Sequence, residues 1–391
     1  MFDTLGTILT RLGDMVAWSS LFSLVSFIVV LSIIVFVHEF GHFIVGRWCG
    51  VGVREFSIGF GRELFGWTDR KGTRWKVSLL PLGGYVRFVG DLNAASMPDG
   101  EEVDGMTPEE RAISFPRQSV GKRAAIIAAG PLANFIFSIV IFAGFFMAYG
   151  KTVLEPRIDE VIVGGRAEAA GLKAGDLILS IDGSKVVGFP DVVQHITLSP
   201  ERPLQIRVQR AGAEVSLTAT PKLEWVTTPV GPVEAGQLGF KVNAQLPERW
   251  HAVSFGPMGA VVEGGRETWS IISQSLTTIG KLITGQVSFK QLSGPVGIGQ
   301  MTGHVAGLGM LALVGYVAFL SVSIGMVNLL PVPVLDGGHL VFCAIEAIRR
   351  RPLDERIQEI AFRLGFALIL TLIVVVSWND LTRIFVSSPP V

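Results

Sequence analysis

The sequence predicts a polytopic α-helical membrane protein that also carries one soluble α+β domain. Of its 391 residues, 49% are hydrophobic and only 17% are charged, and the mean hydropathy of +0.50 is too high for an ordinary soluble protein. Apolar segments near residues 21–45, 124–149, 305–335 and 357–386 are each long enough to span a bilayer. Residues 150–305 form a stretch large enough for a separate soluble domain.

The charges and the cysteines exclude two other classes of protein. The chain has 33 basic and 33 acidic residues, so no net field favours nucleic acid, and we expect no nucleic-acid partner. The two cysteines, Cys49 and Cys343, lie at the ends of apolar segments and offer no disulfide framework, so we assign them no role. The partner that the composition predicts is the lipid bilayer.

An H-E-x-x-H motif ends the first apolar segment. Residues 21–37 carry no charge, and His38, Glu39 and His42 then follow. Helical residues four apart share a face, so both imidazoles can bind one Zn²⁺ with Glu39 beside it. An ionisable group at the centre of a membrane helix costs about 2.5–3.5 kcal/mol on insertion scales, so three such groups on one turn argue against a chance match to the motif. The motif therefore predicts a metalloprotease, in which Glu39 is the general base that deprotonates a water held by zinc.

A cleaved signal peptide is the competing interpretation of this segment. The leader before the apolar run contains Asp3 and Asp14, no small-residue cleavage site follows the run, and cleavage would remove the metal motif. We therefore expect a membrane span that stays in the protein.

The polar segment 47–122 has two parts of different character. Residues 74–89 alternate apolar and polar side chains around a turn signal at 81–84, so we expect β-hairpins within residues 50–90, packed against the buried site. Residues 91–116 are rich in acidic side chains and predict a solvated loop with a short helix.

The second and third apolar segments contain residues that a plain membrane helix lacks. In the second, Asn134 follows Pro131 by one turn, and we interpret Asn134 as a residue that hydrogen-bonds a neighbouring helix rather than as a catalytic group. In the third, Pro331 and Pro333 cannot continue a regular helix. The backbone must therefore open at membrane depth, which is tolerated where the chain lines a cavity.

The soluble region has a clear order of elements. A glycine turn leads into a strand that ends near residue 183, a short helix follows at 191–198, and strands follow at 204–208 and 215–219. Apolar residues then recur at helical spacing over 262–283. They predict an amphipathic helix that either lies on the membrane surface or packs against the soluble domain.

A hydrolytic zinc site needs three protein ligands and one open position, so a third ligand must come from another span. The second span contains no His, Asp, Glu or Cys, and the core of the fourth contains none either. The third leaves Asp336 and His339. We favour Asp336 because it directly follows the opened backbone, whereas His339 lies nearer the polar end and can cap or pack locally. This preference rests partly on a family resemblance given below.

Basic residues set the expected orientation. Arg47 follows the first motif, Lys122 and Arg123 precede the second span, and residues 349–351 are arginines that follow the second motif. By the positive-inside rule this face is cytoplasmic, which places both termini and the soluble domain on the opposite side. The metal would lie about 7 Å inside the interface, from the roughly five-residue helical step between His42 and Arg47.

With these motifs placed, the chain resembles the site-2 protease family of intramembrane zinc metalloproteases, and residues 157–222 resemble a PDZ domain. The motifs that carry the family resemblance are, in order, His38–His42, Gly59–Gly61, Pro81–Tyr85, Gly130–Asn134, Ser293–Gly297 and Asn328–Gly338. The resemblance implies zinc on His38, His42 and Asp336, with Glu39 as general base. It also implies substrate contact at Asn328, Pro331 and Pro333.

The resemblance further implies a location and substrates. The protein would be a zinc endopeptidase of the bacterial inner membrane, with its PDZ-like domain and both termini in the periplasm and its active site near the cytoplasmic face. Substrates would be single-span proteins already trimmed outside the membrane, such as anti-sigma factors, and signal-peptide remnants. The PDZ-like domain could bind an extended peptide at a sheet edge, exclude untrimmed substrates, or act as a structural spacer. The best-known members carry two tandem PDZ domains, whereas this chain has clear signals for one.

Peptide bonds inside a helix are shielded by their own hydrogen bonds, so a membrane-spanning substrate must unwind before attack. We expect the hairpin at 74–89 to capture the unwound stretch by edge pairing, or else only to support the first span. We expect Asn328 to hydrogen-bond the substrate backbone.

Two other functions compete with proteolysis. A non-catalytic scaffold would keep zinc structurally, with His339 as a fourth ligand, and a transporter would explain the broken helix but not Glu39 beside two histidines.

These interpretations divide the chain into seven expected segments. They are the N-terminal segment and first membrane helix at 1–46, a cytoplasmic-side loop with membrane-associated hairpins at 47–122, the second membrane helix at 123–149, a PDZ-like domain at 150–225, an extracytoplasmic linker with the amphipathic helix at 226–304, the third membrane segment at 305–346, and a cytoplasmic loop with the fourth membrane helix at 347–391.

Overall fold

The computed structural model describes residues 2–91, 105–197, 199–228, 231–284, 294–351 and 353–386. The acidic stretch 92–104 of the predicted loop and Ser293 of the quoted motif lie outside these residues. The chain divides into two compact units, of which the first comprises residues 1–142, 264–277 and 288–391, and the second comprises residues 143–263 and 278–287.

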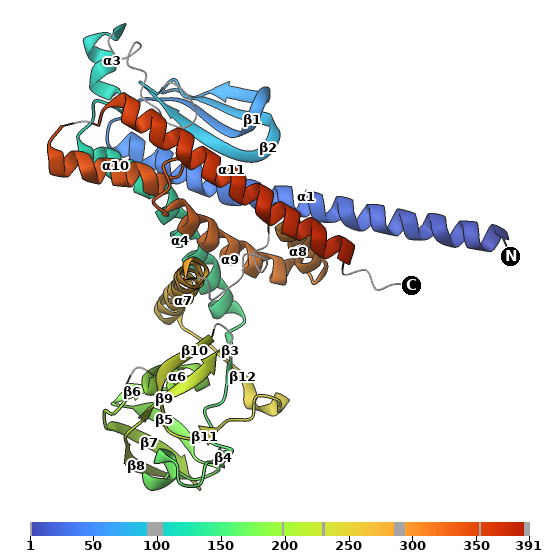
Figure 1. The fold of residues 1–391 in the computed structure, drawn as a ribbon, viewed down its shortest axis with the longest axis vertical. Helices are drawn as coiled ribbons and strands as arrows, with labels where there is room; N and C mark the ends of the chain where they lie inside the picture. Colours follow the sequence, from blue (N-terminus) through green and yellow to red (C-terminus); the bar gives the residue numbers. More distant parts are fainter. Residues whose placement is uncertain are drawn as a thin grey trace. The chain divides into compact units, whose positions relative to one another are not determined.

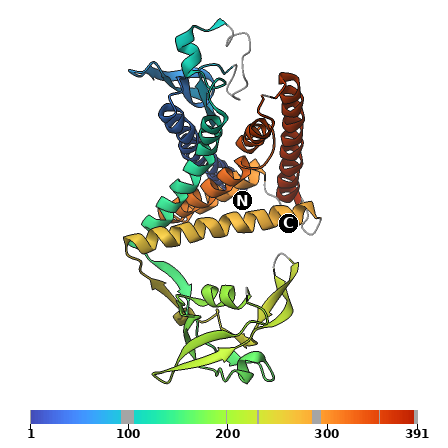
Figure 2. The same cartoon turned by 90° about the vertical axis from the view of Figure 1, so that its left-hand side faces the viewer.

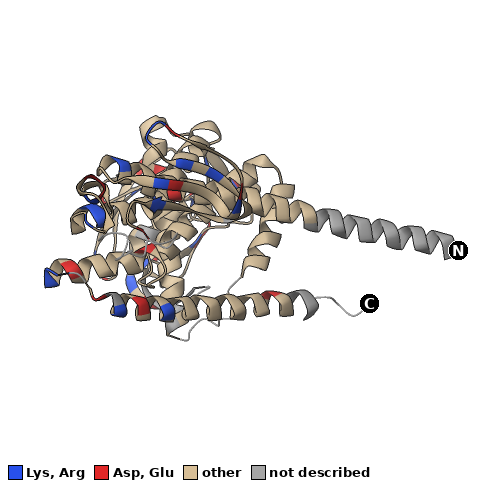
Figure 3. Cartoon of the chain, turned by 90° about the horizontal axis from the view of Figure 1, so that it is seen from above, with Lys and Arg blue, Asp and Glu red and all other residues tan. Residues whose placement is uncertain are grey.

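Within the described residues, four helical segments are long and apolar enough to cross a membrane, as predicted. They are Leu21–Trp48, Val120–Ala148, Met310–Asn328 and Arg356–Thr382. They belong to helices α1 (Phe2–Trp48), α4 (Val120–Ala148), α9 (Met310–Asn328) and α11 (Glu355–Val386), which are labelled in Figure 1. Charged residues lie toward the ends of α11 and leave its middle uncharged (Figure 3), which suits an apolar surrounding.

Helices α1 and α4 pack at very short range. A Cβ atom at Gly41 of α1 would lie 2.3 Å from the carbonyl oxygen of Ala129 and 2.7 Å from the Cβ of Ala133, both in α4. Small residues therefore allow the two backbones to approach closely, as is common between membrane helices. This contact brings the H-E-x-x-H turn of α1 against the first half of α4.

Helices α4 and α9 are joined by side-chain hydrogen bonds to the backbone. Ser138 Oγ donates to the carbonyl of Ala318 at 3.0 Å, and Ser321 Oγ donates to the carbonyl of Asn134 at 3.0 Å. Both serines are buried. In lipid such bonds hold helices in register where no hydrophobic force can do so.

A shorter helix, α8 (Pro295–Gly307), contacts both α1 and α11. Asp380 of α11 is buried and accepts hydrogen bonds from the backbone N–H of Gly294 at 3.0 Å and of Gly297 at 2.8 Å. It thereby satisfies donors that the first turn of α8 leaves free. At the other end of α8, a Cβ atom at Gly303 would lie 1.8 Å from Ser23 Oγ, so α8 and α1 also touch closely.

The predicted interruption of the third segment is confirmed. Helix α9 ends at Asn328, residues 329–335 are not helical, and α10 (Asp336–Arg349) then begins. Leu335 is the N-cap of α10 and has an extended backbone. Pro333 packs against α11, where a Cβ atom at Gly365 would lie 3.1 Å from its ring.

The polar segment after α1 forms a sheet of two long strands, β1 (Val53–Thr68) and β2 (Arg74–Phe88), which pair antiparallel. The tight turn lies between the strands, where Asp69 Oδ1 accepts from the N–H of Thr73 at 3.0 Å. The expected turn at 81–84 is wrong, because β2 continues through it with a break in register. The predicted short helix of this region is present as α3 (Pro108–Ile113).

The register shows that β2 wraps around the start of β1. Phe56, for example, pairs with both Trp75 and Val86, so residues 53–58 lie between the two halves of β2. The second half of β2, residues 84–88, is therefore an edge of the sheet.

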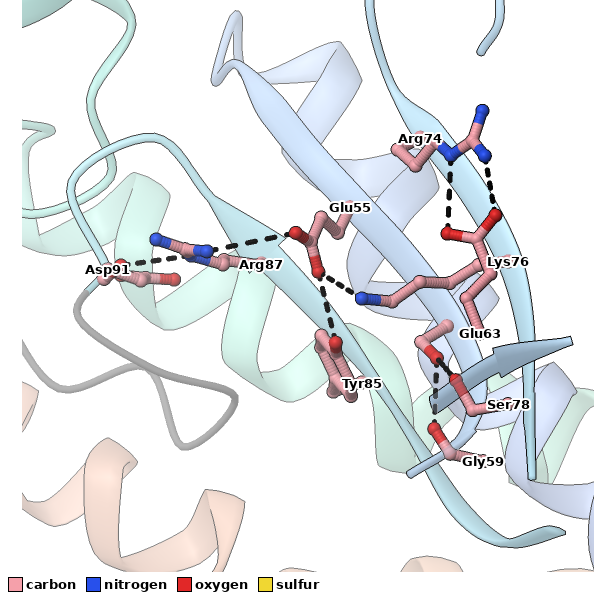
Figure 4. A network of polar contacts seen from close by, with 10 residues as sticks. Glu55, Gly59, Glu63, Arg74, Lys76, Ser78, Tyr85, Arg87 and Asp91 are labelled. Carbon is pink, nitrogen blue, oxygen red and sulfur yellow. Dashed lines mark hydrogen bonds and ion pairs between the residues drawn. The ribbon is translucent and has the colours of Figure 1, made fainter. Parts of the chain in front are cut away.

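Polar contacts hold this arrangement together (Figure 4). Glu55 accepts a hydrogen bond from Lys76 Nζ at 2.6 Å and from the Tyr85 hydroxyl at 3.0 Å, and Arg87 lies 3.7 Å away. Partial burial would raise the pKa of the Glu55 carboxyl, but the hydrogen bonds from Lys76 and Tyr85 outweigh it and hold that pKa below its usual value. One carboxylate thus connects both halves of β2 to β1.

The sheet packs against the helices through one hydrophobic cluster. Its buried members are Phe43, Val51, Val53, Phe56, Val86, Phe88, Phe115, Ile126, Ile127 and Cys343. Burial in this cluster accounts for Cys343, and Cys49 packs at its margin. Both cysteines are free thiols, as expected from the sequence.

The second unit is a small α+β structure, drawn mainly in green in Figure 2. Its four-stranded sheet has the order β6–β5–β7–β8, and strands β4 and β11, β3 and β12, and β9 and β10 form three separate pairs. The strands are β3 (Lys151–Leu154), β4 (Glu160–Val161), β5 (Leu177–Ile181), β6 (Ser184–Lys185), β7 (Leu204–Arg210), β8 (Ala213–Ala219), β9 (Lys222–Thr228), β10 (Gly231–Gln237), β11 (Phe240–Lys241) and β12 (Trp250–Val253). The helices are α5 (Arg166–Ala169) and α6 (Phe189–Thr197).

The core of this unit continues beyond the expected end at residue 225. Leu238 is 2% exposed and belongs to the same cluster as Ile158, Ile181 and Ile206. The predicted helix at 191–198 and the strands at 204–208 and 215–219 are confirmed by α6, β7 and β8. The predicted amphipathic helix is part of α7 (Pro257–Ile283).

An ion pair between a buried carboxylate and a partly exposed arginine supports the sheet of the second unit. Asp176 is fully buried and accepts two hydrogen bonds from Arg210, both at 2.7 Å. Burial would raise the pKa of Asp176, but the hydrogen bonds from Arg210 and from the N–H of Lys173 outweigh it, so that pKa lies below its usual value.

Candidate metal centre and active site

Three metal-competent side chains converge in the first unit. Nε2 of His38 lies 3.2 Å from Nε2 of His42, and Oδ2 of Asp336 lies 3.0 Å from the first and 3.6 Å from the second. In a tetrahedral zinc site with bonds of about 2.0–2.1 Å, the ligand atoms lie about 3.3–3.4 Å apart. The three distances scatter around that value, so the donor set fits such an ion.

The burial of these atoms gives an independent reason to place a metal here. Within the described residues, Asp336 Oδ2 is buried and makes no hydrogen bond of acceptable geometry, although it faces the Nε2 atoms of His38 and His42. A buried carboxylate oxygen without a partner is costly, and a cation held jointly with two imidazoles satisfies it. Three protein ligands leave the fourth position of a tetrahedron open, which is the pattern of a catalytic site.

The side chain of His42 is fixed by α4. Its Nδ1 lies 2.9 Å from the carbonyl oxygen of Ile126, so an Nδ1–H donates there and Nε2 is left with a free lone pair. Gly130 makes room for the ring, because a Cβ atom at Gly130 would lie 2.2 Å from His42 Nε2 and 2.9 Å from His38 Cε1. Glycine is therefore required at this point of α4.

His38 contacts asparagines from two other helices. The side-chain nitrogen of Asn134 in α4 lies 3.3 Å from its Nδ1, and that of Asn328 at the end of α9 lies 3.5 Å from its Nε2. Asn134 is fully buried and its Oδ1 has no partner among the described residues.

Asp336 is placed by the tight start of α10. A Cβ atom at Gly337 would lie 2.3 Å from the carbonyl oxygens of both Leu329 and Leu330, and one at Gly338 would lie 2.3 Å from that of Val332. The two glycines let the chain fold back on itself directly after the break, which turns the Asp336 carboxylate toward α1.

Glu39 lies on the wall of a cavity of about 270 Å³. The same cavity is lined by His38, His42, Asp336 and Asn328, and by Gly84 and Val86 of the β2 edge. A Cβ atom at Gly84 would lie 3.2 Å from Glu39 Cγ, and the backbone of Val86 hydrogen-bonds the Glu39 carboxyl. The same cavity is therefore lined by the Glu39 carboxylate, by three potential metal ligands and by the edge strand of the sheet.

The structure separates the two candidates for a third ligand. Among the described residues the metal-competent atoms that converge belong to His38, His42 and Asp336, and His339 is not part of that group. His339 lines the cavity, but its ring packs against Phe342 and Phe362 at centroid distances of 6.2 and 5.2 Å. The structural-zinc alternative needed His339 as a fourth ligand and receives no support from this geometry.

The remaining predicted site residues are spread more widely. Asn328 lines the cavity, whereas Pro331 is exposed and Pro333 packs on α11, so neither proline lines it. Sequence reasoning placed Gly130 and Asn134 in a motif but missed that Gly130 makes room for the His42 ring and that Asn134 contacts His38. The pair Gly130-Pro131 and the isolated amide of Asn134 were visible in an uncharged run, but nothing in the sequence says which helix they face.

Comparisons with known proteins agree with this chemistry. The family described as peptidase family M50 matches residues 26–372. A protein of Agrobacterium fabrum, described as a candidate zinc metalloprotease, is 48% identical, and the match covers 92% of this chain and 96% of that protein. A protein of Rhizobium meliloti with the same description is 45% identical over 93% of this chain and 97% of its own length. The metalloprotease MmpA of Caulobacter vibrioides is 41% identical, and the match covers 93% of this chain and 96% of that protein.

Proposed function

Because this chain belongs to peptidase family M50, we propose that it cleaves peptide bonds within the membrane-spanning segments of other proteins. It is a zinc metalloendopeptidase, and zinc is its cofactor. The part of the chain that the structure describes contains four helices that can span a membrane. The observation that carries the proposal is the convergence of three ligand atoms beside Glu39 in one cavity.

We assign the zinc to His38, His42 and Asp336. The distances among their ligand atoms and the unpartnered Asp336 Oδ2 support this assignment. When bound, zinc supplies Lewis acidity, which makes water a stronger acid and polarises a peptide carbonyl.

Glu39 is the residue that moves the proton. Its carboxylate lies on the cavity wall and can accept a proton from the attacking water, then return it to the amine that leaves. The hydrogen bond from the Val86 backbone would hold the carboxylate in place for both transfers. His38 and His42 remain neutral ligands and take no part in proton transfer.

The substrate would bind as an added strand on the edge at residues 84–88. This edge borders the cavity through Gly84 and Val86, so a segment paired there would pass directly beside Glu39. Asn328, on the same cavity, would hydrogen-bond the exposed backbone of the unwound segment. Substrate contact at Pro331 and Pro333 stays a prediction, and their part here is to shape the turn before Asp336.

The β1–β2 sheet would lie within the membrane interface. Apolar side chains are exposed on it where a soluble sheet would carry polar ones. They are Phe60, Leu64, Phe65, Trp67, Val77, Leu79 and Leu80. Lipid contact would bring the edge strand to the depth of the unwinding substrate.

The second unit would act as a PDZ-like domain outside the cytoplasm. A groove of about 110 Å³ between α6 and residues 236–240 supports this assignment, with Val192, Leu238 and Phe240 among its lining residues. An extended peptide would enter this groove, and the unit would hold back substrates that have not been trimmed. Because Leu238 belongs to its core, we extend its proposed range from 150–225 to about 150–241.

The proposed location is the bacterial inner membrane, with the active site near the cytoplasmic face. The basic residues around Arg47, Lys122 and 349–351 support this orientation. Single-span proteins trimmed outside the membrane, such as anti-sigma factors, and signal-peptide remnants are the proposed substrates, in keeping with the resemblance to site-2 proteases.

The test uses purified protein and a panel of membrane-spanning peptides, with and without a zinc chelator. Glu39→Gln should retain one zinc per chain and lose cleavage, because the ligands stay while the proton acceptor is gone. Glu359→Gln, an exposed residue of α11, is the matched control and should cleave normally. Cleavage by Glu39→Gln at the wild-type rate would defeat the assignment.

A further inference from the structure

We propose that Asn134 is a positioning residue that accepts the Nδ1 proton of His38 and thereby presents Nε2 to the metal. This inference rests on the proposed ligand set and concerns a residue outside it. Asn134 is fully buried in α4, and its amide contacts His38 Nδ1 at 3.3 Å.

The chemistry of imidazole decides which amide atom must face His38. If Nδ1 accepted a hydrogen bond from the amide nitrogen, the ring proton would sit on Nε2, which could then not bind a metal. When Nε2 binds a metal, Nδ1 carries the proton and needs an acceptor. A half-turn of the Asn134 amide brings its oxygen to that place, and this oxygen otherwise has no partner among the described residues.

The neighbouring histidine shows the same arrangement with a different acceptor. His42 Nδ1 faces the carbonyl oxygen of Ile126 at 2.9 Å, in the same helix α4. Thus α4 provides an acceptor for each ring, a backbone atom for His42 and a side chain for His38. The side chain is the one that a substitution can remove.

The backbone around Asn134 holds the amide in position. Ser321 of α9 donates to the carbonyl of Asn134 at 3.0 Å, and a Cβ atom at Gly325 would lie 3.2 Å from the Asn134 Cβ. The contact between α4 and α9 thus fixes the backbone, while the side chain is directed at α1. Helix packing therefore uses the main chain of Asn134 and leaves its amide for His38.

The experiment measures the dissociation constant for zinc of the full-length protein in detergent, by competition with a chromophoric chelator. Asn134→Leu keeps the branching and the number of side-chain heavy atoms and removes the acceptor, so we expect its dissociation constant to rise about 10–100-fold. Asn134→Asp keeps an acceptor of the Nδ1 proton and should bind zinc at least as tightly as the wild type. Ser138→Ala removes a bond between α4 and α9 without touching His38, and its zinc affinity should not change.

A structural role gives a different pattern. Burying a charge in the metal-free fold should lower the thermal stability of Asn134→Asp, so a merely structural residue would lose zinc affinity together with stability. Wild-type affinity in Asn134→Leu, or an affinity more than tenfold weaker than the wild type in folded Asn134→Asp, overturns the proposal. The aspartate variant decides alone if the leucine variant cannot be purified folded.

His38→Ala separates this inference from the proposed function. If its zinc affinity equals that of the wild type, the ligand set itself is wrong. If His38→Ala loses zinc but Asn134→Leu does not, only the role of Asn134 fails. As a second readout, the visible absorption spectrum of the Co²⁺-loaded protein should change in Asn134→Leu and keep its form in Ser138→Ala.

Discussion

Replacing Gly130 by alanine should disable the metal centre although residue 130 carries no functional group. The added methyl group would lie 2.2 Å from His42 Nε2, 2.5 Å from His42 Cε1 and 2.9 Å from His38 Cε1. Ordinary contacts of a Cβ atom begin near 3.4 Å, so the His42 ring must retreat by about 1 Å. It cannot retreat freely, because its Nδ1 is bound to the Ile126 carbonyl.

A displacement of about 1 Å in a catalytic group can cost about 100-fold in rate, or about 2.7 kcal/mol of activation free energy. We therefore expect Gly130→Ala to lose about 100-fold in kcat/KM on a membrane-spanning peptide and to purify with less zinc. Zinc content is measured by atomic emission, and cleavage is followed by mass spectrometry.

Gly121→Ala is the matched control on the same helix. A Cβ atom there meets no other atom within 4 Å, so the substitution should leave zinc content and activity unchanged. Normal zinc content and normal kcat/KM in Gly130→Ala would refute the reasoning, because they would show that the histidines are not held against α4.

Two further predictions concern α10 and the second unit. Gly337→Ala should reduce kcat/KM by about 100-fold, because its methyl group would collide with the carbonyls of Leu329 and Leu330, whereas Gly315→Ala, which faces open space, should be silent. Because the pKa of Asp176 is depressed in the folded protein, its contribution to stability is present above the unfolded value of about 3.9 and is lost as pH falls through the folded one. Calorimetry should therefore show that the unfolding temperature of this unit decreases below about pH 4. Arg210→Met should lower the free energy of unfolding by about 3 kcal/mol at pH 7 and make the unfolding temperature depend less on pH. An unfolding temperature in Arg210→Met equal to that of the wild type would contradict this.

The sequence alone was sufficient to predict the membrane spans and to predict that residues of the first and third spans converge. His38 and His42 directly follow an uncharged run in a membrane span, where an ionisable side chain is too costly to occur by chance. The prolines at 331 and 333 marked the point at which the helix had to open. Elimination then left Asp336 and His339 as candidates for the third ligand, and the position after the opened backbone together with the family resemblance favoured Asp336. These conclusions depend on local chemistry, which the sequence states directly.

The rest depended on contacts between segments distant in the chain. The role of Gly130 follows from how closely α1 approaches α4, which a glycine in an apolar run does not reveal. The continuation of β2 through residues 81–84 was missed because Pro81 and two glycines are typical of a turn, whereas here Gly83, at a φ of +136°, lets the strand bend around β1. Leu238 was missed because it lies between β10 and β11, beyond the last clear signal of the soluble domain.

The capping of α8 by Asp380 has a consequence for the making of the protein. Through α8, the α11 span is connected to Ser23 of the first span. Asp336 is added only after the 335 residues that precede it have been synthesised. A ribosome-bound fragment can insert the histidines into lipid long before the acid arrives. Nascent chains would thus have no proteolytic activity against other membrane proteins, and this activity would arise only once translation is nearly finished.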